Sequence, residues 1–136
     1  MILMVCIDDR GGMMFNHRRQ SRDRVLCARM LDITKGTRLH VTPYTQKIFD
    51  PAAPLCVSNA PWLEAGMGEY YFAEDGEIFM SDVEKVYLYR WNRAYPGERF
   101  FDADLSALGF ILTHSEDFAG SSHECITEEI YVRNGE

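Results

Sequence analysis

Three stretches near the N-terminus decide the fold class: MILMVCI at residues 1–7, SRDRVLCARMLDITKG at residues 21–36 and RLHVT at residues 38–42. The first is a continuous apolar run, which is typical of a strand covered on both faces of a parallel sheet. The second predicts a helix, with Ser21 as the N-cap, a long apolar set and Gly36 as the stop. A strand follows directly. Together they predict a right-handed βαβ unit, and therefore an α/β fold.

The rest of the chain predicts further strands and little helix. A short helix is expected at 44–49, a loop or short helix at 61–68, and strands near 55–59, 69–73, 85–91, 109–115 and 124–133. No segment between the last two strands is long enough for a helical crossover, so the mixed sheet should be mostly parallel and finish with antiparallel C-terminal strands. No linker, repeat or low-complexity tract interrupts the sequence, so residues 1–136 are expected to form a single domain.

Composition and charge exclude several classes of function. The chain has 14 basic and 21 acidic residues, a formal net charge of -7, which argues against nucleic-acid binding. The opening apolar run is short and is followed at once by Asp8, Asp9 and Arg10, so neither a signal peptide nor a membrane span is expected, and the location should be cytoplasmic. The four cysteines and four histidines lack the spacing of zinc ligands, so no metal site is expected.

Asp23 is the most informative single residue. One face of the expected helix is formed by positions 23, 26, 27, 30, 31 and 34. The residues between 23 and 34 on this face are apolar and are expected to be buried. Asp23 therefore places a carboxylate at the start of a buried apolar face. Burial would raise the pKa of Asp23, and a perturbed pKa makes a residue a candidate for a functional site. The alternative is an ordinary acidic residue that complements the helix dipole.

A basic segment, HRRQSRDR at residues 17–24, surrounds the start of the same helix. Its arginines are Arg18, Arg19, Arg22 and Arg24. At a helix N-terminus they could form a cradle for a phosphate or carboxylate ligand. The alternative is a solvated basic loop that pairs with the chain's own acidic residues, for which Glu69, Glu74, Asp75 and Glu77 are candidates. The aromatic residues at 70–72 and 87–91 are expected to pack in the core.

Both ends of the chain resemble the dihydrofolate reductase family. Residues 83–118, reading VEKVYLYRWNRAYPGERFFDADLSALGFILTHSEDF, and EEIYVRN at 128–134 are similar to its C-terminal part. The matching positions are Val86, Tyr87, Leu88 and Arg90 in a strand, Phe100 and Phe101 in a loop, and Tyr131 and Arg133 at the end. MVCIDDRGGMMFN at 4–16 is similar to the family's first strand and mobile loop. The resemblance implies a dihydrofolate-reductase-like fold in a diverged, shortened member.

The resemblance also implies roles for individual residues. Asp23 matches the family's essential acid, which binds the pterin ring and assists its protonation, and Tyr89 stands where a threonine usually partners that acid. A pterin-like or anionic substrate would lie among Cys6, Ile7, Cys27, Tyr89, Arg18 and Arg22. On this basis Asp23→Asn should abolish pterin binding and spare the fold.

The cofactor half departs from the family's pattern. Thr42 and Pro43 stand where the family has Gly-Arg, and only Thr45 remains of its phosphate contacts. Glu74 and Asp75 replace the Gly-Gly pair whose backbone amides approach the pyrophosphate, and two carboxylates there would repel a dianion. The cofactor subdomain is also expected to be reduced, so neither a cofactor nor ordinary NADPH binding is expected.

Three readings of function remain open. The first is a small-ligand binding or interaction protein without ordinary NADPH-dependent dihydrofolate reduction. The second is an oxidoreductase of the same class that uses NADPH, a flavin, a shorter nicotinamide donor or a partner-completed site. The third is that the shortening exposes an apolar sheet edge, which a second copy covers to make a homodimer.

Overall fold

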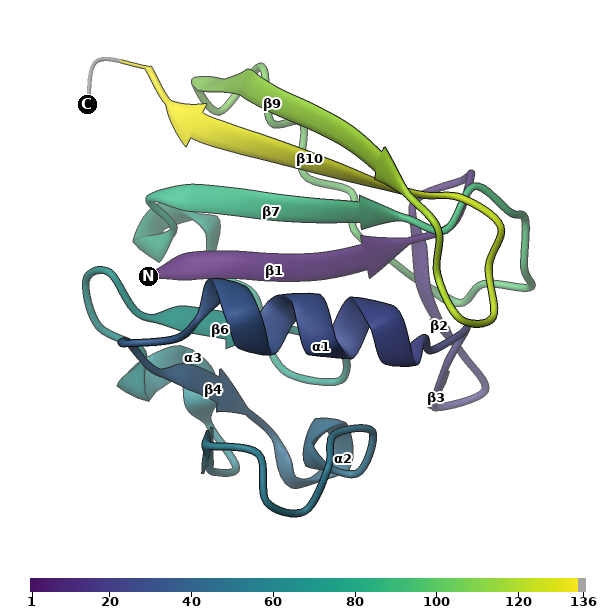
Figure 1. Cartoon of the computed structure of the whole chain (residues 1–136). Coiled ribbons are helices and arrows are strands. Elements are labelled where there is room, and N and C mark those ends of the chain that lie inside the picture. Colours follow the sequence, from purple (N-terminus) through teal and green to yellow (C-terminus); the bar gives the residue numbers. More distant parts are fainter. Residues whose placement is uncertain (135–136) are drawn as a thin grey trace.

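A seven-stranded mixed sheet forms the centre of the molecule (Figure 1). The computed structural model describes residues 1–134. The sheet order is β5-β4-β6-β1-β7-β10-β9. The strands are β1 (Ile2–Ile7), β4 (Leu39–Val41), β5 (Leu55–Val57), β6 (Tyr70–Phe72), β7 (Lys85–Arg90), β9 (Phe110–Phe118) and β10 (Ile126–Arg133). The first five strands in that order pair in parallel, and β10 and β9 pair antiparallel. This confirms the predicted fold class and the antiparallel finish of the sheet.

The central strand β1 separates two apolar cores. Leu3 and Val5 face one core, which Val86 and Leu88 of β7 also enter. Met4 points into the other core, under helix α1 (Arg24–Ile33), where Leu26 and Met30 are buried. Because both faces of β1 are covered, the strand reads as a continuous apolar run rather than an alternating one. The aromatic residues at 70–72 and 87–91 are also buried, as expected.

Helix α1 begins two residues later than the sequence predicts. Asp23, not Ser21, is the N-cap, and its side chain accepts hydrogen bonds from the backbone N–H groups of Val25 and Leu26. A serine and an aspartate are both good N-caps, so residue type alone does not decide between them. Ser21 is left free to make a tertiary contact. The helix ends at Ile33, and Gly36 follows with a φ of +81°.

A second, three-stranded sheet lies beside the carboxyl end of β1 and was not predicted. It consists of β2 (Gly12–Phe15), β3 (Arg18–Arg19) and β8 (Arg99–Phe100), in the order β3-β2-β8. Asn16 and His17 form the tight turn between β2 and β3, with φ values of 51° and 60°. Two-residue hairpins favour this left-handed conformation, which usually selects Asn-Gly. The turn signal was missed because histidine replaces the glycine.

The remaining differences concern boundaries. Helix α2 spans Pro43–Gln46 instead of 44–49, because Thr42 caps it and Pro43 occupies its first turn. Segment 61–68 contains the short helix α3 (Pro61–Glu64), and η1 (Met80–Asp82) precedes β7. The strand predicted at 109–115 continues to Phe118, where it still pairs with Ile126. Within residues 1–134, no helix is both long and apolar enough to cross a membrane.

Candidate functional site

Asp23 is the centre of a buried hydrogen-bond network at the start of α1. Its Oδ1 accepts from the N–H groups of Val25 at 2.9 Å, Leu26 at 3.2 Å and Ser121 at 3.0 Å. Its Oδ2 accepts from the N–H of Ser122 at 2.8 Å and lies 3.0 Å from His123 Nδ1. Five donors therefore surround one carboxylate that is almost fully shielded from solvent. Both oxygens of the Asp23 carboxylate are already used within residues 1–134, so neither is free to bind a pterin ring.

The pKa of Asp23 is lowered in the structure, whereas the sequence predicts that burial raises it. Burial alone would raise this pKa, but the hydrogen bonds from His123 and from the N–H groups of Ser121, Ser122 and Leu26 outweigh burial. The net result is a pKa well below the usual value, so Asp23 stays ionised. A permanently ionised carboxylate orients its neighbours and is a poor proton donor.

The loop between β9 and β10 supplies the distant part of this network. Gly120 packs so tightly against the Asp23 carboxylate and Ile126 that a Cβ atom would collide with both. The Gly120 N–H donates to the His123 carbonyl, and Ser121 Oγ accepts from the N–H of Arg24. The loop therefore closes over the N-terminus of α1, where Ser121 binds the N–H of Arg24 and Asp23 binds those of Val25 and Leu26, so a ligand does not reach these N–H groups.

A second buried carboxylate, Glu74, lies after β6, at the position that the resemblance matches to a Gly-Gly pair. Arg19 Nε lies 3.2 and 3.0 Å from its two oxygens, and Arg19 Nη2 lies 3.2 Å from Oε1. Thr45 Oγ1 donates to Oε1 at 2.8 Å. Burial raises the pKa of Glu74 and remains the larger effect, although Arg19 and Thr45 lower it. One acidic residue and one arginine of the basic segment thus pair internally, as the alternative reading expected.

Two open cavities flank these networks. One, of about 340 Å³, is lined by Arg22, Asp23, Arg24, Cys27, Ile48 and Ser122. Two smaller spaces of about 10 Å³ each are lined by Ser21, Cys6 and Glu74 among others, and the first of them also borders Asp23. The space beside Asp23 therefore holds no more than a water-sized group, whereas the outer cavity is bordered by two exposed arginines.

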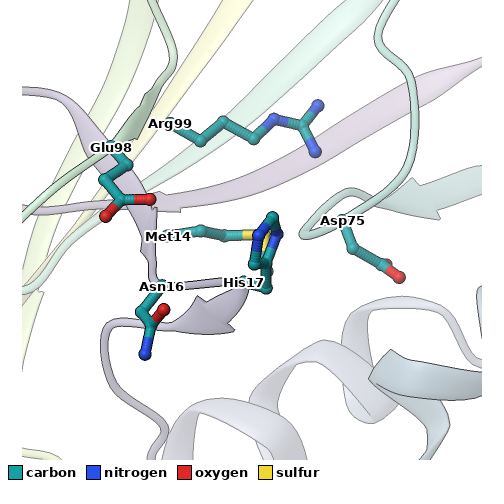
Figure 2. Close-up of a pocket in the computed structure, with 6 residues that line it drawn as sticks. All are labelled: Met14, Asn16, His17, Asp75, Glu98 and Arg99. Carbon is teal, nitrogen blue, oxygen red and sulfur yellow. The ribbon is translucent and has the colours of Figure 1, made fainter.

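The larger open cavity, of about 480 Å³, lies beside the β2–β3 hairpin (Figure 2). Asn16 and His17 enter it from the hairpin turn, Asp75 from the segment after β6, and Glu98 and Arg99 from the start of β8. The Arg99 guanidinium donates to the backbone carbonyls of Glu74 and Gly76. The Arg99 guanidinium therefore already has hydrogen-bond partners within the protein. The carboxylates of Asp75 and Glu98 also border the cavity.

The structure brings some of the expected site residues together and separates others. Cys6, Cys27, Arg22 and Asp23 meet around one small space. Ile7 points into the core on the opposite face of β1. Tyr89 is fully buried and donates to Glu128 at 2.8 Å, so it does not partner Asp23.

Two more of these residues have other surroundings. Arg18 is exposed on β3 and lines neither open cavity. Thr45, the one expected cofactor contact, is fully buried and its hydroxyl is bound to Glu74.

Sequence reasoning missed His123. It lies 100 residues from Asp23, and an isolated histidine carries no spacing signal. The only hint in the sequence is the small, polar stretch GSSH at 120–123, which is typical of a tight loop.

One further cluster has metal-ligating side chains but already holds a cation of the protein. His114, Glu116 and Glu128 lie close together on β9 and β10. Arg29 of α1 pairs with Glu116 at 2.9 Å and with Glu128 at 3.0 Å. A guanidinium between the two carboxylates neutralises the charge that would attract a metal ion.

Comparisons with known proteins identify the fold. No protein-family model and no curated protein matches the sequence. Among solved structures, the chain is similar to dihydrofolate reductase from Enterococcus faecalis complexed with NADP(H) and RAB-propyl, with a TM-score of 0.68 and 11% sequence identity. The match covers 98% of this chain and 95% of that chain. The protein therefore has a dihydrofolate-reductase-like fold.

Proposed function

We propose that this protein binds a small anionic ligand and does not carry out ordinary NADPH-dependent reduction of dihydrofolate. The observation that carries the proposal is the buried contact of Glu74 with Arg19 and Thr45. This contact lies where the resemblance implies free backbone N–H groups that would bind the pyrophosphate of the cofactor. An anionic phosphate there would have to displace a carboxylate that is already satisfied, at a cost in electrostatic free energy.

The outer cavity of about 340 Å³ is the proposed binding site. Arg22 and Arg24 border it, and neither has a carboxylate within 4.0 Å among residues 1–134, whereas Arg19 and Arg29 are both paired. Two unpaired guanidinium groups favour an anion, and Arg binds carboxylates and phosphates through paired hydrogen bonds. The pterin part of the earlier expectation is disfavoured, because the Asp23 oxygens are already used.

Binding of inorganic phosphate tests this site. Titration at constant ionic strength should shift the backbone amide resonances of residues 22–27, and Arg22→Gln and Arg24→Gln should each weaken the response. Arg10→Gln, which removes an exposed arginine outside the cavity, is the matched control. Equal phosphate affinity in the wild type and in both cavity variants would contradict the proposal.

The alternative function is an oxidoreductase of the dihydrofolate reductase class with an altered cofactor site. The cavity in Figure 2 is the space that favours it, because its volume of about 480 Å³ is in the range of small-molecule sites. Asp75 and Glu98 border this cavity, and they oppose the phosphates of a dinucleotide. NADPH binding therefore separates the two functions.

We further propose that two copies associate through β9 and that the protein is cytoplasmic. β9 ends the sheet, and Ile111 and Leu112 are each nearly half exposed on it, which leaves apolar surface and an unpaired edge. Four free cysteines fit a reducing compartment.

Light scattering after size exclusion should give the mass of a dimer. Leu112→Lys should shift the protein to a monomer, while Met67→Lys, at a more exposed apolar residue away from β9, should not. A wild-type protein that is monomeric at all concentrations would contradict the association.

A further inference from the structure

His123 lies between Ser21 and Asp23 in an arrangement that neither the resemblance nor the proposed ligand site explains. Ser21 Oγ is 2.9 Å from His123 Nε2, and His123 Nδ1 is 3.0 Å from Asp23 Oδ2. A hydroxyl, an imidazole and a buried carboxylate in this order are the groups that activate a serine nucleophile. The three residues come from two segments, the start of α1 and the loop between β9 and β10.

The surroundings select the imidazole tautomer that this chemistry needs. The ionised Asp23 carboxylate only accepts hydrogen bonds, so the proton of neutral His123 belongs on Nδ1. The lone pair of Nε2 then faces the Ser21 hydroxyl. The Trp91 ring stacks on the imidazole at a centroid distance of 4.4 Å and fixes its orientation. Tyr95 Oη, at 3.3 Å from Nε2, is a second and longer contact.

Ser21 is better placed to react than the two neighbouring thiols. Burial raises the pKa of Cys27 to about 12, with the charge of Glu74 adding to the effect, and burial also raises the pKa of Cys6. Both thiols are therefore protonated and weak nucleophiles near neutral pH. Ser21 is half-buried and borders both of the spaces of about 10 Å³. Each space holds at most one water-sized group, so the acyl group of an ester would stay on the solvent-exposed side of Ser21.

We propose that Ser21 is a nucleophile for esters with a small acyl group, with His123 as the general base and Asp23 as the positioning residue. Ser21 Oγ forms a bond to the ester carbonyl carbon while its proton passes to His123 Nε2. The ester C–O bond then breaks, and the leaving alcohol takes the proton from Nε2. In a second step water attacks the acyl group, gives its proton to Nε2, and Ser21 Oγ recovers a proton on leaving.

Both steps should be slow with ordinary esters. The N–H groups of Val25, Leu26, Ser121 and Ser122 all point at Asp23, so they do not stabilise an oxyanion on the substrate in either step. An ester with a good leaving group, such as p-nitrophenol, speeds only the first step, so with such an ester we expect an acyl-enzyme to accumulate. This activity is independent of anion binding by Arg22 and Arg24, since neither residue takes part in the proton transfers.

Acetylation by p-nitrophenyl acetate tests the proposal. Mass spectrometry of acid-quenched peptides should show Ser21 acetylated on the order of 100-fold faster than the exposed Ser81, the contribution typical of a general base. Release of p-nitrophenol should show a burst that Ser21→Ala removes and Ser81→Ala keeps. Acetylation of Ser21 no faster than Ser81 in the wild type would overturn the proposal, and this arm requires no variant to fold.

Two variants test the role of the imidazole. His123→Gln, with its fold verified by circular dichroism, should acetylate Ser21 at the rate of Ser81. Tyr95→Phe removes the competing hydroxyl near Nε2 and should acetylate Ser21 at least as fast as the wild type. A folded His123→Gln variant with the wild-type rate at Ser21 would show that His123 is not the base.

Discussion

Asp23→Asn is expected to destabilise the protein by about 3 kcal/mol at neutral pH, a loss in the range measured for hydrogen bonds to buried charged groups. An asparagine keeps one acceptor oxygen for the N-cap of α1, but its NH₂ group would face the N–H of Ser122 and His123 Nδ1. Two donors would then oppose each other in a buried space. From the structure we therefore expect the variant to lose stability, whereas the sequence alone predicts that it spares the fold. Chemical denaturation measures the loss.

The pH dependence gives this prediction a second readout. Because the folded pKa of Asp23 lies below its unfolded value of about 3.9, the carboxylate's contribution is fully present above that pH and is lost as the pH falls. The wild type should therefore lose more stability than Asp23→Asn between neutral pH and pH values below about 4. Asp32→Asn, at an exposed position on the same helix, should change stability by less than about 0.5 kcal/mol. A loss no larger for Asp23→Asn than for Asp32→Asn would contradict the network.

Arg19→Met is expected to cost about 3 kcal/mol at pH 7, because it leaves the buried Glu74 carboxylate without its cation. Arg18→Met is the matched control, since Arg18 is the exposed neighbour on the same strand. Arg19→Met combined with Glu74→Gln should recover much of the loss, because the buried charge is removed and Thr45 still has an oxygen to bind.

The cost of Arg19→Met should shrink as the pH falls. The pKa of Glu74 is raised in the folded protein, and removing the guanidinium raises it further. A raised folded pKa favours the folded state below the unfolded pKa, and this advantage is lost as the pH rises through the folded pKa. The variant should therefore be more stable at about pH 5 than at pH 7, by thermal unfolding. Equal stability of Arg19→Met and Arg18→Met at pH 7 would show that the pair is not a structural element.

The sequence predicts the main sheet well because its signals are local. The apolar run at 1–7, the amphipathic stretch before Gly36 and the short strand after it define the βαβ unit without tertiary information. The small sheet was missed because β3 and β8 have two residues each, and no periodicity can be recognised at that length. The start of α1 was misplaced because Ser21 and Asp23 are equally acceptable caps by residue type, and the tertiary contacts of Ser21 with His123 and of Asp23 with residues 121–123 are not visible in the sequence.

The candidate site was predicted only in part, because its chemistry depends on contacts between distant segments. Asp23 was identified as a buried carboxylate at the start of α1, but the direction of its pKa depends on a loop about 100 residues away. The pairing of Glu74 with Arg19 was one of several possible pairs, because composition does not distinguish Glu74 from Glu69, which instead contacts His40. The burial and charge of a residue can be predicted from its own segment of sequence, whereas the distant residues that it pairs with cannot.

Titration with NADPH, followed by tryptophan fluorescence, tests the central claim most directly. Trp91 borders the small spaces beside Glu74, and Trp62 supplies a second signal on the other side of the sheet. With Glu74, Arg19 and Thr45 bound to one another, we predict no saturable quenching at any NADPH concentration that the optical measurement permits. Saturable quenching with a dissociation constant in the micromolar range would contradict the account and favour the oxidoreductase function.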